Sequence, residues 1–126
     1  MSIARETTAA LIKPLTGAVI RRYVAGDAVA AGEVVSLQSD GYVDPSDATA
    51  TDEAIGIAVQ AATAAGETID VVVLGPVLCL SGATPGNTVF NSTTAGEPEG
   101  DGSNYETAVG WAESATVLFV LPEHLA

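Results

Sequence analysis

The chain has 126 residues, of which 48% are hydrophobic and 16% are charged, a composition that fits one folded domain and excludes general disorder. Sixteen Asp and Glu residues against four Lys and Arg residues give a formal net charge of -12, which disfavours binding to nucleic acid. The longest apolar stretch, residues 71–80, is interrupted by Gly75 and Pro76 and is too short to span a bilayer, and the polar N-terminus does not support secretion.

The basic residues are confined to the first 22 positions, and the sequence from Tyr23 onward contains no Lys or Arg. Two explanations of this asymmetry stay open. Either the acidity serves solubility or reflects a saline habitat, or a basic arm docks on an acidic partner while an acidic body faces solvent.

Residues 1–17 form a segment distinct from the rest of the chain. Pro14 disfavours helix at the residue before it and cannot donate a hydrogen bond inside a sheet. Ile3, Leu11 and Ile12 are exposed unless another surface covers them. We therefore predict an extended N-terminal arm over residues 1–17, loose alone and ordered on contact, followed by a β-rich domain over residues 18–126.

Short alternating segments separated by turn residues follow in the chain. Val35 and Leu37 are expected to face inward and Ser36 outward, with surface or connecting loops over residues 44–53, 61–67 and 91–104. Many short strands at such spacing predict an all-β fold, a small β-barrel or sandwich. The expected strands cover residues 19–24, 34–37, 42–43, 55–59, 69–74, 77–80, 88–90, 108–112 and 116–121.

One pattern occurs twice, as Ala-Ile-Gly-Ile-Ala at residues 54–58 and as Ala-Val-Gly-Trp-Ala at residues 108–112. Each copy is followed by a turn and a strongly apolar segment, at residues 69–74 and 116–121 respectively. The pattern indicates two similar β-hairpins.

Residues that could carry chemistry are few, and neither catalysis nor a cofactor is predicted. His124 lies three residues from the C-terminus, where a catalytic triad cannot hold it, and Cys79 lies in an apolar run without an evident base. Alternating acids at Glu97, Glu99 and Asp101 in the Gly-rich segment 97–104 could ligate Ca²⁺, but their spacing is not that of an EF-hand and solvated acidic loops are common.

Trp111 is the only tryptophan of the chain. A single Trp on a strand most often belongs to the core. The alternative is a contact between subunits, where Trp is enriched.

The order and spacing of several Gly-rich motifs resemble those of the capsid cement or head decoration proteins of tailed phages. The resemblance covers about residues 18–122. The motifs are Ala-Gly-Asp at 25–27, Gly-Glu-Val-Val at 32–35, the pattern at 54–58, Ala-Gly-Glu-Thr-Ile-Asp-Val at 65–71 and Val-Gly-Trp-Ala at 109–112.

What the resemblance implies is a small β protein, often a homotrimer, made in the host cytoplasm, that binds the outer surface of a mature virion capsid and stabilises it. The partner is the major capsid protein, and neither nucleic acid nor membrane is involved. In such families the N-terminal arm orders against the capsid. Carried over to this chain, the expected capsid contacts are Ile3, Arg5, Leu11, Ile12 and Lys13.

Parts of the sequence also fit other classes of protein. The segment 26–35 is similar to the hairpin of biotinyl and lipoyl carrier domains, but these need a Lys at the hairpin tip, and the only Lys is Lys13. Two alternatives stay open, namely another virion component such as a tail-tube-like subunit, and a β module that binds a small ligand.

Overall fold

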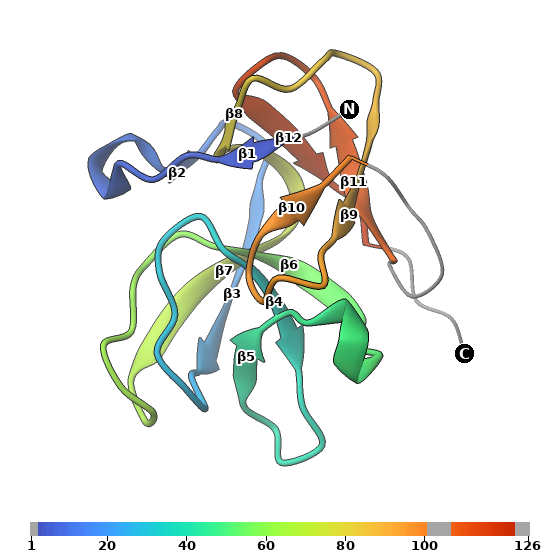
Figure 1. Ribbon diagram of the computed structural model, residues 1–126. Helices are drawn as coiled ribbons and strands as arrows, with labels where there is room; N and C mark the ends of the chain where they lie inside the picture. The colour runs from blue at the N-terminus through green and yellow to red at the C-terminus, as the bar shows by residue number, and fades with distance from the viewer. Residues whose placement is uncertain (1–2, 101–106, 123–126) are drawn as a thin grey trace.

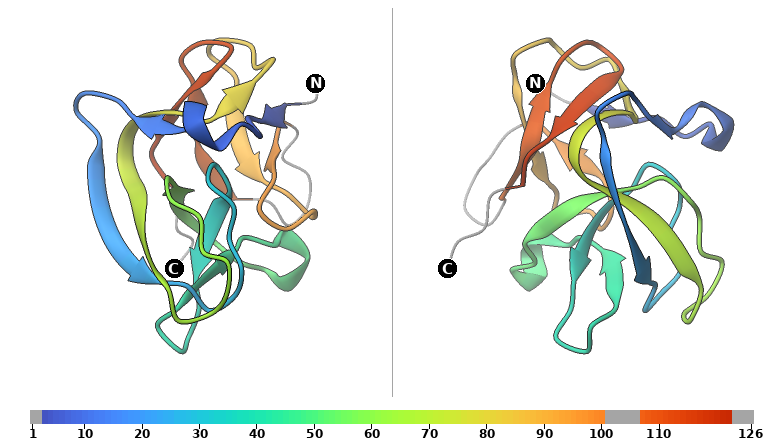
Figure 2. Two further views of the ribbon diagram at one scale, coloured as in Figure 1. Left: turned by 90° about the vertical axis from the view of Figure 1, so that its left-hand side faces the viewer. Right: turned by 180° about the vertical axis from the view of Figure 1, so that it is seen from behind.

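A computed structural model describes residues 3–100 and 107–122, and the fold over these residues is all-β, as predicted (Figure 1). A ten-stranded sheet has the order β10-β9-β11-β12-β7-β6-β4-β5, with β2 and β3 also pairing with β7, and it curls on itself as Figures 1 and 2 show. The strands are β1 (Ala4–Arg5), β2 (Lys13–Pro14), β3 (Val19–Val24), β4 (Val34–Leu37), β5 (Val43–Pro45), β6 (Ala54–Ala58), β7 (Thr68–Leu78), β8 (Leu80–Ser81), β9 (Thr88–Asn91), β10 (Pro98–Glu99), β11 (Ala108–Ala112) and β12 (Val117–Val120).

Helical structure in the described residues is limited to two 3-10 turns, η1 (Ala9–Leu11) and η2 (Ala48–Ala50). Residues 61–67 are not helical, as expected for a connecting loop. Within the described residues, 3–100 and 107–122, no helix is long and apolar enough to cross a membrane.

The repeated pattern forms two antiparallel hairpins, β6–β7 and β11–β12, which confirms the prediction from residues 54–58 and 108–112. Its central glycines have a common role. A Cβ placed on Gly56 would collide with the carbonyl oxygen of Val72, and one on Gly110 with the carbonyl oxygen of Phe119. Only glycine lets the neighbouring backbone approach so closely, so the repeat marks a packing requirement.

The strand β7 runs without a break from Thr68 to Leu78, and the predicted separation into two strands at Gly75-Pro76 is wrong. Its first part pairs with β3 and β6, and its last part with β2 and β12, so β7 joins both halves of the sheet (Figure 1). Gly75 has φ +102, and a Cβ there would lie 2.9 Å from Ala18 Cα. The glycine therefore bends the strand without ending it.

Two apolar clusters form the core. One lies between the halves of the sheet and includes Val34, Ile57 and Leu118, and the other includes Val35, Ile69 and Val71. Burying each Val, Ile or Leu side chain contributes about 1.5–3 kcal/mol before chain entropy is counted. The large buried side chains of the core are aliphatic, in keeping with the low aromatic content of 5%.

The inward and outward faces of β4 differ from those predicted. Ser36 is buried and Leu37 is 48% exposed. The register against β6 shifts between Val35 and Ser36, and such a bulge breaks the simple alternation of faces. The Ser36 hydroxyl donates to Ser46 Oγ at 2.6 Å, so the buried serine has a partner.

Two predicted loops also contain more structure than expected. Ser46, in the segment 44–53, is fully buried and accepts a hydrogen bond from Asn91 Nδ2 at 3.0 Å. In the segment 91–104, β10 pairs with β9. The buried side chains of Ser36, Ser46 and Asn91 thereby connect β4 with β9 through satisfied hydrogen bonds.

Candidate interaction surface

The N-terminal segment is packed into the domain, which differs from the loose arm predicted from the sequence. Ile3 and Ile12 are each only 7% exposed and belong to the larger apolar cluster. β1 pairs with β8, β2 pairs with β7, and the Glu6 N–H donates to the Cys79 carbonyl at 2.8 Å. Residues 3–17 therefore share a core with the rest of the chain.

The five residues predicted to contact a capsid fall into two groups. Leu11 is half exposed and Lys13 is exposed, so both can meet a partner where they lie. Ile3, Ile12 and the largely covered Arg5 face the protein itself. These three could contact a capsid only if the segment left its place in the core.

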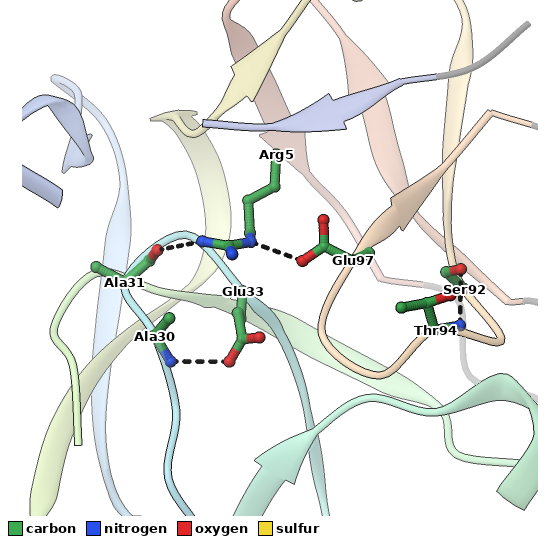
Figure 3. A network of polar contacts seen from close by, with 7 residues as sticks. All are labelled: Arg5, Ala30, Ala31, Glu33, Ser92, Thr94 and Glu97. Carbon is green, nitrogen blue, oxygen red and sulfur yellow. Dashed lines mark hydrogen bonds and ion pairs between the residues drawn. The ribbon is translucent and has the colours of Figure 1, made fainter. Parts of the chain in front are cut away.

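Arg5 anchors the segment at the centre of a polar network (Figure 3). Its Nε donates to Glu97 Oε2 at 2.8 Å, and a terminal nitrogen donates to the Ala31 carbonyl at 3.2 Å. The Arg5 side chain is 16% exposed and that of Glu97 is 35% exposed, so solvent screens this ion pair only in part.

Glu33 lies beside the same ion pair, and its carboxylate accepts the Ala30 N–H at 2.8 Å (Figure 3). Burial raises the pKa of Glu33, and Glu97 and Asp27 raise it further, against the opposing effects of the Ala30 hydrogen bond and Arg5. One arginine thus faces two carboxylates, of which Glu97 makes the direct contact.

Of the three acids considered as Ca²⁺ ligands, Glu97 and Glu99 lie within the described residues. The Glu97 carboxylate is engaged by Arg5, and Glu99 lies on β10 opposite Phe90. Asp101 and the other residues of 101–104 lie outside the described residues, as does His124. Over residues 3–100 and 107–122, no group of three or more His, Cys, Asp or Glu side chains is arranged to hold a metal ion.

Cys79 is 1% exposed, and burial raises the pKa of its thiol. The thiolate, which is the reactive form, is therefore suppressed. In this structure Cys79 packs as a small apolar side chain of the larger cluster.

Two hollows lie near β4 and β5. One, of about 430 Å³, is lined by Leu37, Ile55 and residues 50–53, and the other, of about 310 Å³, has Asp27, Asp44, Asp47 and Asp52 among its lining residues. Burial foremost, followed by repulsion from Asp40, Asp27 and Asp52, raises the pKa of Asp44. The second hollow is thus unfavourable for an anionic ligand.

Trp111 lies outside the core, on the outer face of the sheet formed by β9, β11 and β12. It is 39% exposed and stacks on Phe119, with ring centroids 4.6 Å apart and an interplanar angle of 12°. Leu121, next along the chain after β12, is 50% exposed. These three residues form an apolar outer face, and a subunit contact at Trp111 stays a prediction.

The surface with the clearest chemical character is the edge formed by β2 and β3. It carries Lys13, Arg21 and Arg22, all exposed, and we call these three residues the basic edge. Residues 7–26 contain no Asp or Glu, but Asp70 of the neighbouring strand β7 pairs with Arg22. The clustering of the bases is visible in the sequence, but the sequence does not identify β3 as an edge, so Arg21 and Arg22 were predicted to belong to no site.

The sequence was compared with protein-family models and with curated proteins, and no match was found in either comparison.

Proposed function

We propose that this protein is a structural virion component that binds the outer surface of a mature capsid through its major capsid protein and stabilises the shell. Two features support the proposal, namely the resemblance of the Gly-rich motifs to decoration proteins of tailed phages and the charge pattern of the surface. The observation that carries it is the basic edge, where Lys13, Arg21 and Arg22 are exposed along one edge of the sheet, Lys13 opposite Leu78 and the two arginines opposite Val71 and Asp70 of β7.

This charge pattern suits a protein with one attached and one free side. Cations on the attached side favour contact with acidic groups of the shell, and the acidic remainder repels other particles. A ligand that binds only the mature shell stabilises it by RT ln(1 + [L]/Kd). Stabilisation of this kind needs neither catalysis nor a cofactor.

As part of this proposal the protein assembles as a homotrimer, with Trp111, Phe119 and Leu121 as the candidate subunit contact. Exposed aromatic side chains of this kind are enriched in interface centres. Three linked copies would engage the shell with higher avidity than one. Sedimentation equilibrium of the wild type and of Trp111→Ser tests this part, since a monomeric wild type would exclude it.

Co-sedimentation of the purified protein with bare mature capsids of its source virus tests the function. We expect saturable binding at a fixed ratio to the major capsid protein and a higher temperature of capsid disruption. Lys13→Glu should weaken the binding, while Thr93→Glu, at an exposed position on the loop between β9 and β10, serves as control. Absence of binding at every salt concentration would exclude decoration.

A further inference from the structure

The strand β3 is an open edge of the sheet. Within residues 3–100 and 107–122 it pairs with β7 alone, and Figure 2 shows it on the outer side of β7. Its first four residues are exposed, including Val19 at 45% and Ile20 at 43%. An edge of this kind offers unpaired main-chain donors and acceptors to another strand.

The direction of the free main-chain groups follows from the hydrogen bonds at the end of β3. The Ala25 N–H donates to the Glu67 carbonyl at 2.8 Å, and the register from Ile20 to Val24 is unbroken. Because antiparallel ladders alternate, Arg21 and Tyr23 direct their main-chain groups toward β7. Those of Ile20, Arg22 and Val24 therefore point outward.

Other edges of the sheet contain proline, which cannot donate a main-chain hydrogen bond. Pro14 lies on β2, Pro45 on β5 and Pro98 on β10. β3 lacks proline and is longer than each of these three strands. Proline is one of the ways in which proteins block unwanted pairing at an edge, and β3 does not use it.

The charges of β3 indicate what kind of strand fits it. Side chains alternate along a strand, so Arg21 and Arg22 project from opposite faces. Arg22 Nε lies 3.2 Å from Asp70 Oδ1, and the Arg22 side chain stays 70% exposed. No ion pair is found for Arg21 among the described residues. A second copy of β3 would bring arginine against arginine, which disfavours pairing between two copies of this edge.

We propose that β3 accepts an extended strand from the partner protein that carries two consecutive acidic residues followed by apolar ones. The partner strand runs antiparallel to β3 and forms main-chain hydrogen bonds with Ile20, Arg22 and Val24. Its two carboxylates lie beside Arg21 and Arg22 on opposite faces, and its apolar residues cover Val19 and Ile20. The identity of the partner as a capsid protein rests on the proposed function, but the chemistry of the edge does not.

A synthetic peptide tests the edge without a capsid. The ¹⁵N-labelled full chain is titrated with the peptide Gly-Ser-Thr-Glu-Glu-Val-Val-Thr-Ser-Gly, and with a control in which both Glu are Lys. We expect amide shifts confined to β3 and slower hydrogen exchange at Ile20, Arg22 and Val24 with the acidic peptide alone. Arg21 and Tyr23 should already be protected in the free protein. No change at millimolar peptide, or equal changes with both peptides, would overturn the proposal.

Variants separate the main-chain and charge contributions. Arg21→Gln with Arg22→Gln should weaken acidic peptide binding about tenfold. Thr93→Glu with Ala95→Glu makes the same change in net charge on the exposed loop before β10 and should leave the affinity unchanged. Arg22→Pro removes an outward N–H as well as the charge, so it should bind more weakly than Arg22→Gln. Thermal melting checks that each variant is folded.

The same variants on capsids separate this proposal from the proposed function. Suppose that wild type binds capsids and that the Arg22→Pro and Arg22→Gln variants bind them as well as wild type does. This result would overturn the edge proposal alone. A peptide response without any capsid binding would support the edge and exclude the decoration function. If the arginines only guard β3 against aggregation, the Gln variants would aggregate and the acidic peptide would not bind, which also overturns the proposal.

Discussion

Arginine is used in two different ways in the first 22 residues of this chain. The Arg5 side chain is 16% exposed and bonds to Glu97 and to the Ala31 carbonyl, so its charge is paired within the fold. Arg21 and Arg22 stand on an open strand, and Arg22 stays 70% exposed although it contacts Asp70. The same residue type serves as an anchor in one region and as an exposed surface charge in the other.

This difference changes which part of the N-terminal region can recognise a partner. A basic residue near the chain start suggests a contact residue when only the sequence is read. In the structure, the surroundings of an arginine determine whether it can contact a partner. An arginine in an ion pair that is partly shielded from water stabilises the fold and is not available for such a contact. The basic edge holds the cations that are left to face another molecule.

The largest expected effect tests whether the N-terminal segment belongs to the fold. Ile12→Ala should lower the free energy of unfolding by about 2–4 kcal/mol, because it removes a core side chain and leaves a cavity. Its neighbour Leu11 is 50% exposed, and Leu11→Ala should change stability by less than about 0.5 kcal/mol. Guanidinium denaturation of both variants is the measurement. Equal stabilities would mean that the segment is detached in solution.

The next effect concerns the anchor itself. Arg5→Met keeps an apolar stem but loses the charge, and Glu97→Gln removes the opposite charge. A double-mutant cycle with these two changes should give a coupling energy of about 1 kcal/mol, since the ion pair is partly shielded from water. Thermal or denaturant unfolding of the four proteins gives this value. A coupling near zero would show that apolar packing alone holds the segment.

Local pattern was enough to predict the all-β class and both hairpins. The Gly residues of 54–58 and 108–112 mark close approaches of neighbouring strands, and alternation around them defines strands whatever the distant partners are. The faces of Ser36 and Leu37 were predicted wrongly because a bulge depends on the register against β6, which is a long-range property. The continuity of β7 through Gly75 likewise depends on the strands beside it.

The candidate surface was only partly predictable for the same physical reason. The clustering of bases could be counted, but the burial of Ile3 and Ile12 depends on β8 and on residues far along the chain. The pairing of Arg5 with Glu97 joins positions 92 residues apart. No local signal distinguishes such an arginine from Arg21, for which no ion pair is found within residues 3–100 and 107–122.

A smaller effect concerns pH at the anchor. Because the pKa of Glu33 is raised above 4.5 in the folded state, the folded protein binds this proton more tightly than the unfolded chain. The contribution of Glu33 to the free energy of unfolding therefore falls as pH rises from its pKa in the unfolded chain through its pKa in the folded protein. Ionised Glu33 stabilises the fold less than protonated Glu33 does. Glu33→Gln should be more stable than wild type at pH 7, and the gap should close below pH 4.5. Denaturation across this pH range is the test, and a constant gap would place the cause outside the titration.

The smallest expected effect lies at the basic edge and completes the comparison with Arg5. Arg22→Gln and Asp70→Asn should each change the free energy of unfolding by less than about 0.5 kcal/mol, because an exposed ion pair is screened by water and salt. Raising the salt concentration should remove even this difference. Denaturant unfolding at low and high salt measures it. A cost as large as that at Arg5 would mean that Arg22 is also committed to the fold, and the edge would then lose one of the two charges proposed to receive a partner strand.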